Sequence, residues 1–318
     1  MKLSSALGLA LPALLLAGTA HGADAPVVVT SIKPVHSLVS AIMQGVGTPE
    51  LIVDGAASPH TYSMKPSNAR ALQNAKVVFW IGPGLEVFLA KPLETLGTDA
   101  SIVELDSAPG LTRLKFREGG AFEAHDDGDD DDGDKSGTDH DHGHGAFDTH
   151  LWLDPVNAKA MAAEITTTLV AADPANALAY QGNAEALNAR LDALDKEISG
   201  IVSPVKDKPF IVFHDAYQYF EHRYHVRVAG SITVSPETIP GAERIAEIHK
   251  KVVDLGATCV FAEPQFQPRL VDVVLEGTRA RAGVLDPEAG TLDAGPDLYF
   301  TLMRAIANNL KDCLSRES

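Results

Sequence analysis

Short apolar runs alternate with longer helical segments along most of the chain, and this alternation predicts an α/β fold. In the first half, the runs expected as strands are residues 27–31, 51–53, 77–81 and 102–105. Helices are expected between them, one opening at Pro34 and another at Pro66. Strands that alternate with helices in this way form βαβ units with a mainly parallel sheet.

The second half of the chain repeats this order of elements. Its expected strands are residues 209–213, 225–229, 259–261 and 283–285. Its expected helices open at Asp215 or cover residues 241–255, 268–279 and 296–314. The sequence therefore predicts two lobes, each with a mainly parallel β-sheet flanked by helices.

One helical segment, residues 176–202, is longer than a small lobe needs. Its apolar residues recur at steps of four and three, which places them in one stripe along one face. They are Leu187, Leu191, Leu194, Ile198 and Ile201. At about 1.5 Å per residue this helix is roughly 40 Å long. We expect it to lie across both lobes as a spine; the alternative is an ordinary packing helix within one lobe.

The N-terminus has the features of a secretory signal peptide. Lys2 precedes an apolar run at residues 6–17, and Ala20-His21-Gly22 offers a small-x-small cleavage pattern. The run is too short to span a bilayer, so we expect an exported, soluble mature chain. The expected segments are a signal peptide at 1–22, an N-terminal lobe at 23–173, a linking helix at 174–203 and a C-terminal lobe at 204–318.

An acidic segment interrupts the N-terminal lobe. Between His125 and His144 the chain has nine aspartates, four glycines, one lysine and almost no apolar residue. Such a segment buries too little apolar surface to offset the entropy of ordering it, so residues 123–147 are expected to be disordered. Histidine-rich tracts are compositional candidates for metal binding, and the auxiliary weak ligands would be His125, His140, His142 and His144. The alternative is a solvated acidic insertion without a role.

The charge of the chain favours cations as ligands. The net charge is −17, and removing the signal peptide with Lys2 takes it to −18. The segment from His125 to His144 contributes −8 of this total. This balance argues against nucleic acids and anionic membranes as partners.

The chain contains two cysteines, Cys259 and Cys313. In an oxidising compartment the default for such a pair is a structural disulfide, which would tie the last helix to the C-terminal sheet. A metal-binding cysteine pair is the alternative, although the two positions lack a ligand spacing.

Three of the twelve histidines share a context that suits metal binding. His60 follows the strand expected at 51–53, His150 follows the acidic segment, and His214 directly follows the strand at 209–213. Ligands of parallel α/β sheets gather at the carboxyl ends of strands, and imidazole suits tetrahedral zinc. The remaining histidines have blander contexts. His21 leaves with the signal peptide, His36 and His249 lie within predicted helices, and His222 and His225 belong to a solvated face.

A fourth ligand could be water or a carboxylate. Asp286 follows the last short strand and is the candidate carboxylate; Glu263, after the strand at 259–261, is expected to support the site or the fold. Both acids precede proline, so the alternative is that these pairs are simply turn residues.

Several motifs in order along the chain resemble those of bacterial periplasmic zinc-binding proteins that feed ABC importers. They are Ala57-Ser58-Pro59-His60-Thr61-Tyr62, Val212-Phe213-His214-Asp215-Ala216-Tyr217 and Phe261-Ala262-Glu263-Pro264-Gln265-Phe266, together with the acidic insertion and residues 148–155. The resemblance covers essentially the whole mature chain. It implies two α/β lobes joined by one long helix, with the metal held between them.

The resemblance places the three histidine ligands of the family on His60, His150 and His214. Some members use a glutamate just before the first histidine, where this chain has Pro59. Manganese-binding and some zinc-binding relatives use an aspartate at the position that Asp286 matches. Two coordination sets therefore stay open: three histidines with water, and three histidines with Asp286. Cys259 and Cys313 also resemble the disulfide of Gram-negative members.

The resulting prediction is a non-enzymatic, monomeric protein in the periplasm of a Gram-negative bacterium. It would capture Zn²⁺ and deliver it to an ABC permease in the inner membrane, with a periplasmic metallochaperone as a further candidate partner. The alternatives are a manganese-type relative that uses Asp286, a zinc hydrolase with Glu263 as general base, and an adhesin or metal buffer without transport. No HExxH helix accompanies the histidines, which disfavours the hydrolase.

Overall fold

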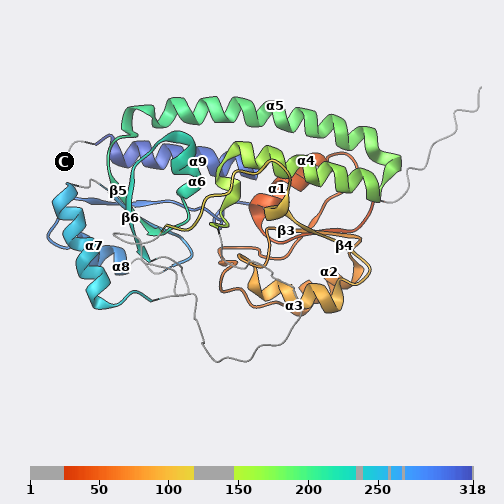
Figure 1. The fold of residues 1–318 in the computed structure, drawn as a ribbon, viewed down its shortest axis with the longest axis horizontal. Coiled ribbons are helices and arrows are strands. Elements are labelled where there is room, and N and C mark those ends of the chain that lie inside the picture. The colour runs from red at the N-terminus through yellow and green to blue at the C-terminus, as the bar shows by residue number, and fades with distance from the viewer. Residues whose placement is uncertain (1–24, 118–146, 234–238, 257–258, 267–268, 317–318) are drawn as a thin grey trace, which may run out of the picture.

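The computed structural model describes residues 25–117, 147–233, 239–256, 259–266 and 269–316 (Figure 1). The predicted signal peptide and the acidic segment with His125, His140, His142 and His144 lie outside the described residues. Within the described residues, no helix combines the length and apolar character needed to cross a membrane.

Two four-stranded parallel sheets form the centres of the two lobes (Figure 1). The first has the order β2-β1-β3-β4 and the second the order β6-β5-β7-β8, and every neighbouring pair is parallel. The strands are β1 (Val28–Thr30), β2 (Glu50–Leu51), β3 (Val77–Trp80), β4 (Ser101–Glu104), β5 (Phe210–His214), β6 (Val228–Thr233), β7 (Cys259–Ala262) and β8 (Arg281–Val284). The predicted α/β class with a parallel sheet in each lobe is confirmed.

Helices connect and cover the strands. They are α1 (Lys33–Ile42), α2 (Pro66–Asn74), α3 (Val87–Leu96), α4 (Pro155–Ala172), α5 (Ala177–Val202), α6 (Gln218–Tyr224), α7 (Ala242–Leu255), α8 (Arg269–Leu275) and α9 (Leu298–Leu314). Proline occupies the first turn of α1, α2 and α4, where its fixed φ suits the helix and its missing N–H costs nothing. Asp154 also caps α4 by accepting a hydrogen bond from the backbone N–H of Val156.

Helix α5 runs along both lobes, as the spine prediction requires (Figure 1). It packs against α1 and α4 of the N-terminal lobe and against α9 of the C-terminal lobe. The Asn183 side chain donates to the carbonyl of Ile42 at 2.9 Å, while Arg190 stacks on the Phe300 ring at 3.9 Å. One hydrophobic core includes buried residues of both sheets and of α5, so the lobes share a continuous interior on this side.

Several elements of the second lobe differ from their predicted bounds, and two of the shifts have a clear cause in the backbone. Strand β6 starts three residues later than expected, because His225 ends α6 in the left-handed conformation with φ 55°. Helix α8 ends at Leu275, earlier than expected, and Gly277 follows with φ 72°. A residue with positive φ cannot continue a right-handed helix, so both shifts arise at left-handed positions.

Cys259 at the start of β7 and Cys313 in α9 form a disulfide across 54 residues, with their Cα atoms 6.2 Å apart. The alternative of a cysteine metal pair is therefore excluded, because both sulfurs are bonded to each other. The crosslink ties the last helix to the C-terminal sheet.

Candidate metal centre

The three histidines predicted as ligands meet between the lobes. His60 lies in the loop after β2, His150 precedes the short helix η2 (Leu151–Leu153), and His214 is the last residue of β5. Nε2 of His150 lies 3.3 Å from Nε2 of His60 and 3.3 Å from Nε2 of His214. Among the described residues, these three form the one group of histidine, cysteine or acidic side chains able to converge on a metal ion.

The spacing of these nitrogens suits zinc. Zinc–nitrogen bonds are about 2.0–2.1 Å, which in a tetrahedron places neighbouring ligand atoms about 3.4 Å apart. The two separations of 3.3 Å agree with this value. The separation of His150 from each of the other two histidines therefore suits a tetrahedral cation.

His214 is held by a glutamate from the neighbouring strand. Its Nδ1 lies 2.7 Å and 2.8 Å from the two carboxylate oxygens of Glu263, which follows β7. An Nδ1–H that donates to this carboxylate leaves the Nε2 lone pair for a metal. Burial raises the pKa of the Glu263 carboxyl to about 8. A cation on the imidazole favours the ionised carboxylate, because an opposite charge lowers the pKa of an acid.

His150 is held in the same way by an acid close to it in the sequence. The Oδ1 atom of Asp148 accepts from Nδ1 of His150 at 2.8 Å and from its backbone N–H at 2.9 Å. Asp148 is only 1% exposed. Its Oδ2 accepts from the Gln218 side chain, and its carbonyl accepts from the Tyr219 hydroxyl at 2.6 Å. Asp148 was not among the residues predicted to support the site, although an acid two residues before a candidate ligand is a usable signal.

His60 is the most exposed of the three. It is partly buried, whereas His150 and His214 are 5% and 2% exposed. Its loop is fixed nearby by Tyr62, whose hydroxyl donates to the carbonyl of Ile52 at 3.0 Å and whose ring contacts Phe88. The open side of the centre is therefore the side on which His60 lies.

Asp286 is not part of the converging group. Its Oδ1 accepts from the Gln265 side chain at 2.8 Å and from the Gly290 N–H at 3.0 Å. Its Oδ2 accepts from the backbone and side chain of Thr291, both at 3.1 Å. The carboxylate thus organises its own turn, which is the alternative that the Asp-Pro pair raised. Coordination of a fourth position by water or by Asp286 stays a prediction.

The other histidines of the described residues, His36, His222, His225 and His249, do not belong to the converging group. His36 is buried in α1, with Nε2 3.2 Å from the carbonyl oxygen of Pro49, and Nδ1 of His249 lies 3.1 Å from the carbonyl oxygen of Val274. His222 and His225 are exposed, as expected for a solvated face.

A buried acid also marks the corresponding place in the N-terminal lobe. Glu86 follows β3, is fully buried, and accepts hydrogen bonds from the Ser31 hydroxyl and from the backbone N–H groups of Ile81 and Gly82. Burial raises the pKa of this carboxyl to about 7. Glu86 belongs to no group of metal-binding geometry among the described residues.

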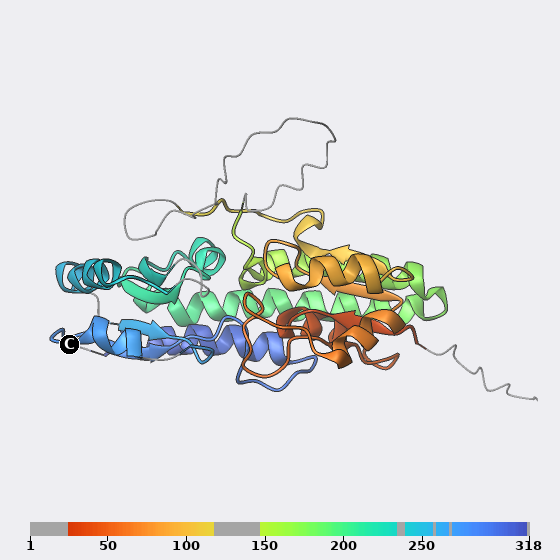
Figure 2. The same cartoon turned by 90° about the horizontal axis from the view of Figure 1, so that it is seen from below.

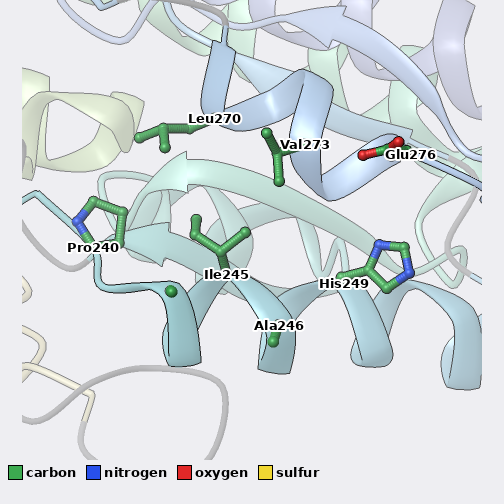
Figure 3. A pocket seen from close by; sticks show the side chains of 8 residues that line it. Pro240, Ile245, Ala246, His249, Leu270, Val273 and Glu276 are labelled. Carbon is green, nitrogen blue, oxygen red and sulfur yellow. The ribbon is translucent and has the colours of Figure 1, made fainter.

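A surface pocket of about 670 Å³ lies between α7 and α8, away from the histidines. Figure 3 shows Ile245 from one helix facing Leu270 and Val273 from the other, with His249 and Glu276 at one end. None of the three converging histidines lines it. The candidate metal centre is therefore distinct from this mainly apolar pocket.

Comparison with known proteins agrees with this geometry. Residues 28–313 match the family model described as zinc-uptake complex component A, periplasmic. The chain is 58% identical to the high-affinity zinc uptake system protein ZnuA of Brucella suis biovar 1, over 95% of this chain and 94% of that protein. It is 37% identical to the protein of the same name from Yersinia pestis, over 95% of each.

Solved structures show the same architecture. A crystal structure of ZnuA superposes with a TM-score of 0.74 at 25% identity, covering 91% of this chain and 99% of that one. A zinc-bound deletion mutant of ZnuA superposes with a TM-score of 0.73, also at 25% identity, covering 93% of this chain and all of that one. The chain therefore belongs to the ZnuA family of periplasmic zinc-uptake components.

Proposed function

We propose that this protein captures Zn²⁺ in the periplasm with His60, His150 and His214 and delivers it for import. The observation that carries the proposal is the convergence of three Nε2 atoms at a spacing that suits tetrahedral zinc. Nitrogen ligands favour zinc over manganese, which prefers oxygen-rich sites. The zinc-uptake names of the relatives support the same ion.

The receiving partner is the ABC permease of the inner membrane. The relatives are named as proteins of zinc uptake systems, and a binding component in such a system needs a membrane partner to carry the ion inward. We further propose that the protein is exported by its N-terminal signal peptide, acts as a monomer, and can receive zinc from a periplasmic metallochaperone.

Two features disfavour the other functions considered. Both carboxylate oxygens of Glu263 lie within 2.8 Å of Nδ1 of His214, so this acid serves the histidine and not a water nucleophile. The oxygens of Asp286 are engaged by Gln265, Gly290 and Thr291, which leaves the converging atoms all nitrogen. The first point argues against a hydrolase and the second against a manganese-type site.

Calorimetric titration with a competing chelator tests the ligand assignment. We expect one tight zinc site per chain, lost in His60→Ala, His150→Ala and His214→Ala alike. His222→Ala is the matched control, because His222 is exposed on α6 and, among the residues that the structure describes, belongs to no converging group. Retention of the tight site in any of the three ligand variants would contradict the assignment.

The acidic segment is tested separately by deleting residues 125–144. We expect the deletion to remove weak zinc sites and to spare the tight site. A tight site that disappears with the segment would mean that the segment itself supplies ligands.

A growth experiment separates import from buffering. In a strain that lacks this protein, only a protein that takes part in transport should restore growth under zinc limitation.

A further inference from the structure

The chain on either side of residues 118–146 forms a structure that we call the neck, defined as residues 112–117 with 147–148. Its base is fixed to the N-terminal lobe. The backbone N–H and carbonyl of Thr112 both bond to the side chain of Asn157 in α4, at 2.8 Å and 3.0 Å. The Arg113 guanidinium donates to the carbonyl of Asp106. The two sides of the neck are joined by Asp148 N–H, which donates to the carbonyl of Leu114 at 2.8 Å.

The neck then crosses to the C-terminal lobe. Figures 1 and 2 show the yellow stretch after β4 running from the N-terminal lobe towards α6. The buried hydroxyl of Tyr219 in α6 accepts from the Leu114 N–H at 3.1 Å and donates to the Asp148 carbonyl at 2.6 Å. The neighbouring Gln218 side chain donates to the carbonyl of Lys115 at 3.0 Å. One hydroxyl therefore fastens both sides of the neck to α6.

Arg117 makes the second crossing contact. Its guanidinium forms a two-pronged ion pair with Asp215, and the same group pairs with Glu221 of α6. The Arg117 and Asp215 side chains are only 18% and 8% exposed. Bidentate arginine–carboxylate pairs shielded from water are stronger and more directional than exposed pairs.

Both crossing contacts end next to a metal ligand. Asp148, held by Tyr219, orients the imidazole of His150. Asp215, held by Arg117, is the residue directly after His214. His150 enters from the N-terminal lobe and His214 from the C-terminal sheet, and their Nε2 atoms are 3.3 Å apart. The neck therefore connects the two backbone stretches whose separation decides whether these nitrogens can share an ion.

We propose that the neck is an inter-lobe tie in which Arg117 and Tyr219 act as positioning residues that set how long the captured ion is held. This inference rests on the proposed function. Among the described residues, neither Arg117 nor Tyr219 belongs to the converging group, so loss of the tie should raise the rate of zinc release while the three imidazoles remain to capture zinc. Loss of a ligand, in contrast, removes the tight site altogether.

The test measures zinc release from the loaded full-length mature chain into excess chelator by stopped flow, and zinc association in parallel. We expect Arg117→Gln to raise the release rate about tenfold, the scale expected when charge-assisted hydrogen bonds are lost. Association should change by less than about twofold, because most effects of contact loss appear in dissociation. Tyr219→Phe should raise release in the same direction.

Two further variants separate positioning from general stability. Arg117→Lys keeps the charge but loses the fork, so its release rate should fall between those of wild type and Arg117→Gln. Arg304→Gln is the matched control, because it removes the ion pair between Arg304 of α9 and Glu197 of α5. The side chains of this pair are 43% and 42% exposed, respectively. The release rate of this variant should equal that of wild type.

The outcomes distinguish the two proposals. Unchanged release in Arg117→Gln, or an equal rise in Arg304→Gln, overturns the tie. A second measurement adds Asp215→Asn to the Arg117→Gln chain. If the release rate does not rise further, the two residues act through their ion pair; if the two substitutions raise it additively, the role of the Arg117–Asp215 pair in the tie is overturned. If the wild-type chain instead binds no zinc tightly, the proposed function fails, whatever the neck does.

Discussion

The two lobes share one strand order but use the same position differently. In each sheet the first strand is flanked by the second and third, as β2-β1-β3-β4 and β6-β5-β7-β8. At the carboxyl end of β1 lies Ser31, and at the carboxyl end of β5 lies His214. Each is hydrogen-bonded to a buried glutamate that follows the neighbouring strand, Glu86 in the first lobe and Glu263 in the second.

The difference shows that the scaffold supplies a buried acid and the strand-end residue decides its use. With a serine, the acid is a structural acceptor that also binds the backbone N–H groups of Ile81 and Gly82. With a histidine, the acid orients an imidazole towards the lobe interface. The N-terminal lobe instead places His60 and His150 outside its strands, after β2 and before η2. The candidate ligand of the C-terminal lobe is thus positioned by a sheet, and the candidate ligands of the N-terminal lobe by loops.

The most severe test makes the second lobe resemble the first. We expect His214→Ser to weaken zinc binding by more than about 100-fold. Loss of a residue that only hydrogen-bonds to a metal ligand lowers metal affinity by up to about 100-fold. Loss of the ligand itself should therefore lower it further. Competition with a chelator of known affinity measures the change. If the variant kept wild-type affinity, the sheet-borne histidine would have no role in the centre.

Removing only the orienting acid should have a smaller effect. Glu263→Gln keeps the volume but not the anion, and we expect zinc affinity to fall about 10- to 100-fold, the usual range for the partner of a ligating histidine. Isothermal titration at neutral pH gives the value, with circular dichroism as the control for folding. An unchanged affinity would mean that packing alone orients His214.

The equivalent change in the first lobe, Glu86→Gln, should leave zinc affinity within about threefold, since the Glu86 carboxylate accepts from Ser31, Ile81 and Gly82, none of which is a candidate ligand. Its effect lies in the pH dependence of the zinc-free protein. Burial raises the pKa of Glu86 from 4.5 to about 7, so the folded state binds an extra proton between these values. That contribution to the free energy of unfolding is complete below pH 4.5 and is lost as pH rises to about 7.

In Glu86→Gln the free energy of unfolding should therefore fall less between pH 4.5 and 7.5 than in the wild type, by an amount on the order of 3 kcal/mol. Urea unfolding of the wild type and the variant at both pH values measures the difference. An equal change in the free energy of unfolding between the two pH values for both proteins would show that the Glu86 carboxyl does not gain a proton on folding. A large loss of zinc affinity in this variant would break the contrast between the lobes.

Much of this arrangement follows from local pattern. Alternating apolar runs and helical segments predicted both sheets, and the strand ends at residues 51–53 and 209–213 pointed to His60 and His214. The parallel sheet makes such reasoning work, because carboxyl ends of its strands meet at one edge.

What escaped prediction depends on pairings far apart in sequence or on backbone detail. Arg117 meets Asp215 across 98 residues, and no periodicity encodes such a contact. The left-handed His225 delays β6, a position that residue type alone does not specify. The motif marked Asp286 as a possible ligand, which stays a prediction, but it did not reveal that the Asp286 oxygens accept from Gly290 and Thr291.

The disulfide between Cys259 and Cys313 has a consequence for when the C-terminal lobe is completed. It closes a 54-residue stretch onto β7, the strand that ends just before Glu263. Cytosolic glutathione keeps thiols reduced, whereas the periplasm allows them to oxidise. A newly synthesised chain therefore lacks this brace until it has left the cytosol, and oxidation becomes a maturation step at the strand that supports His214.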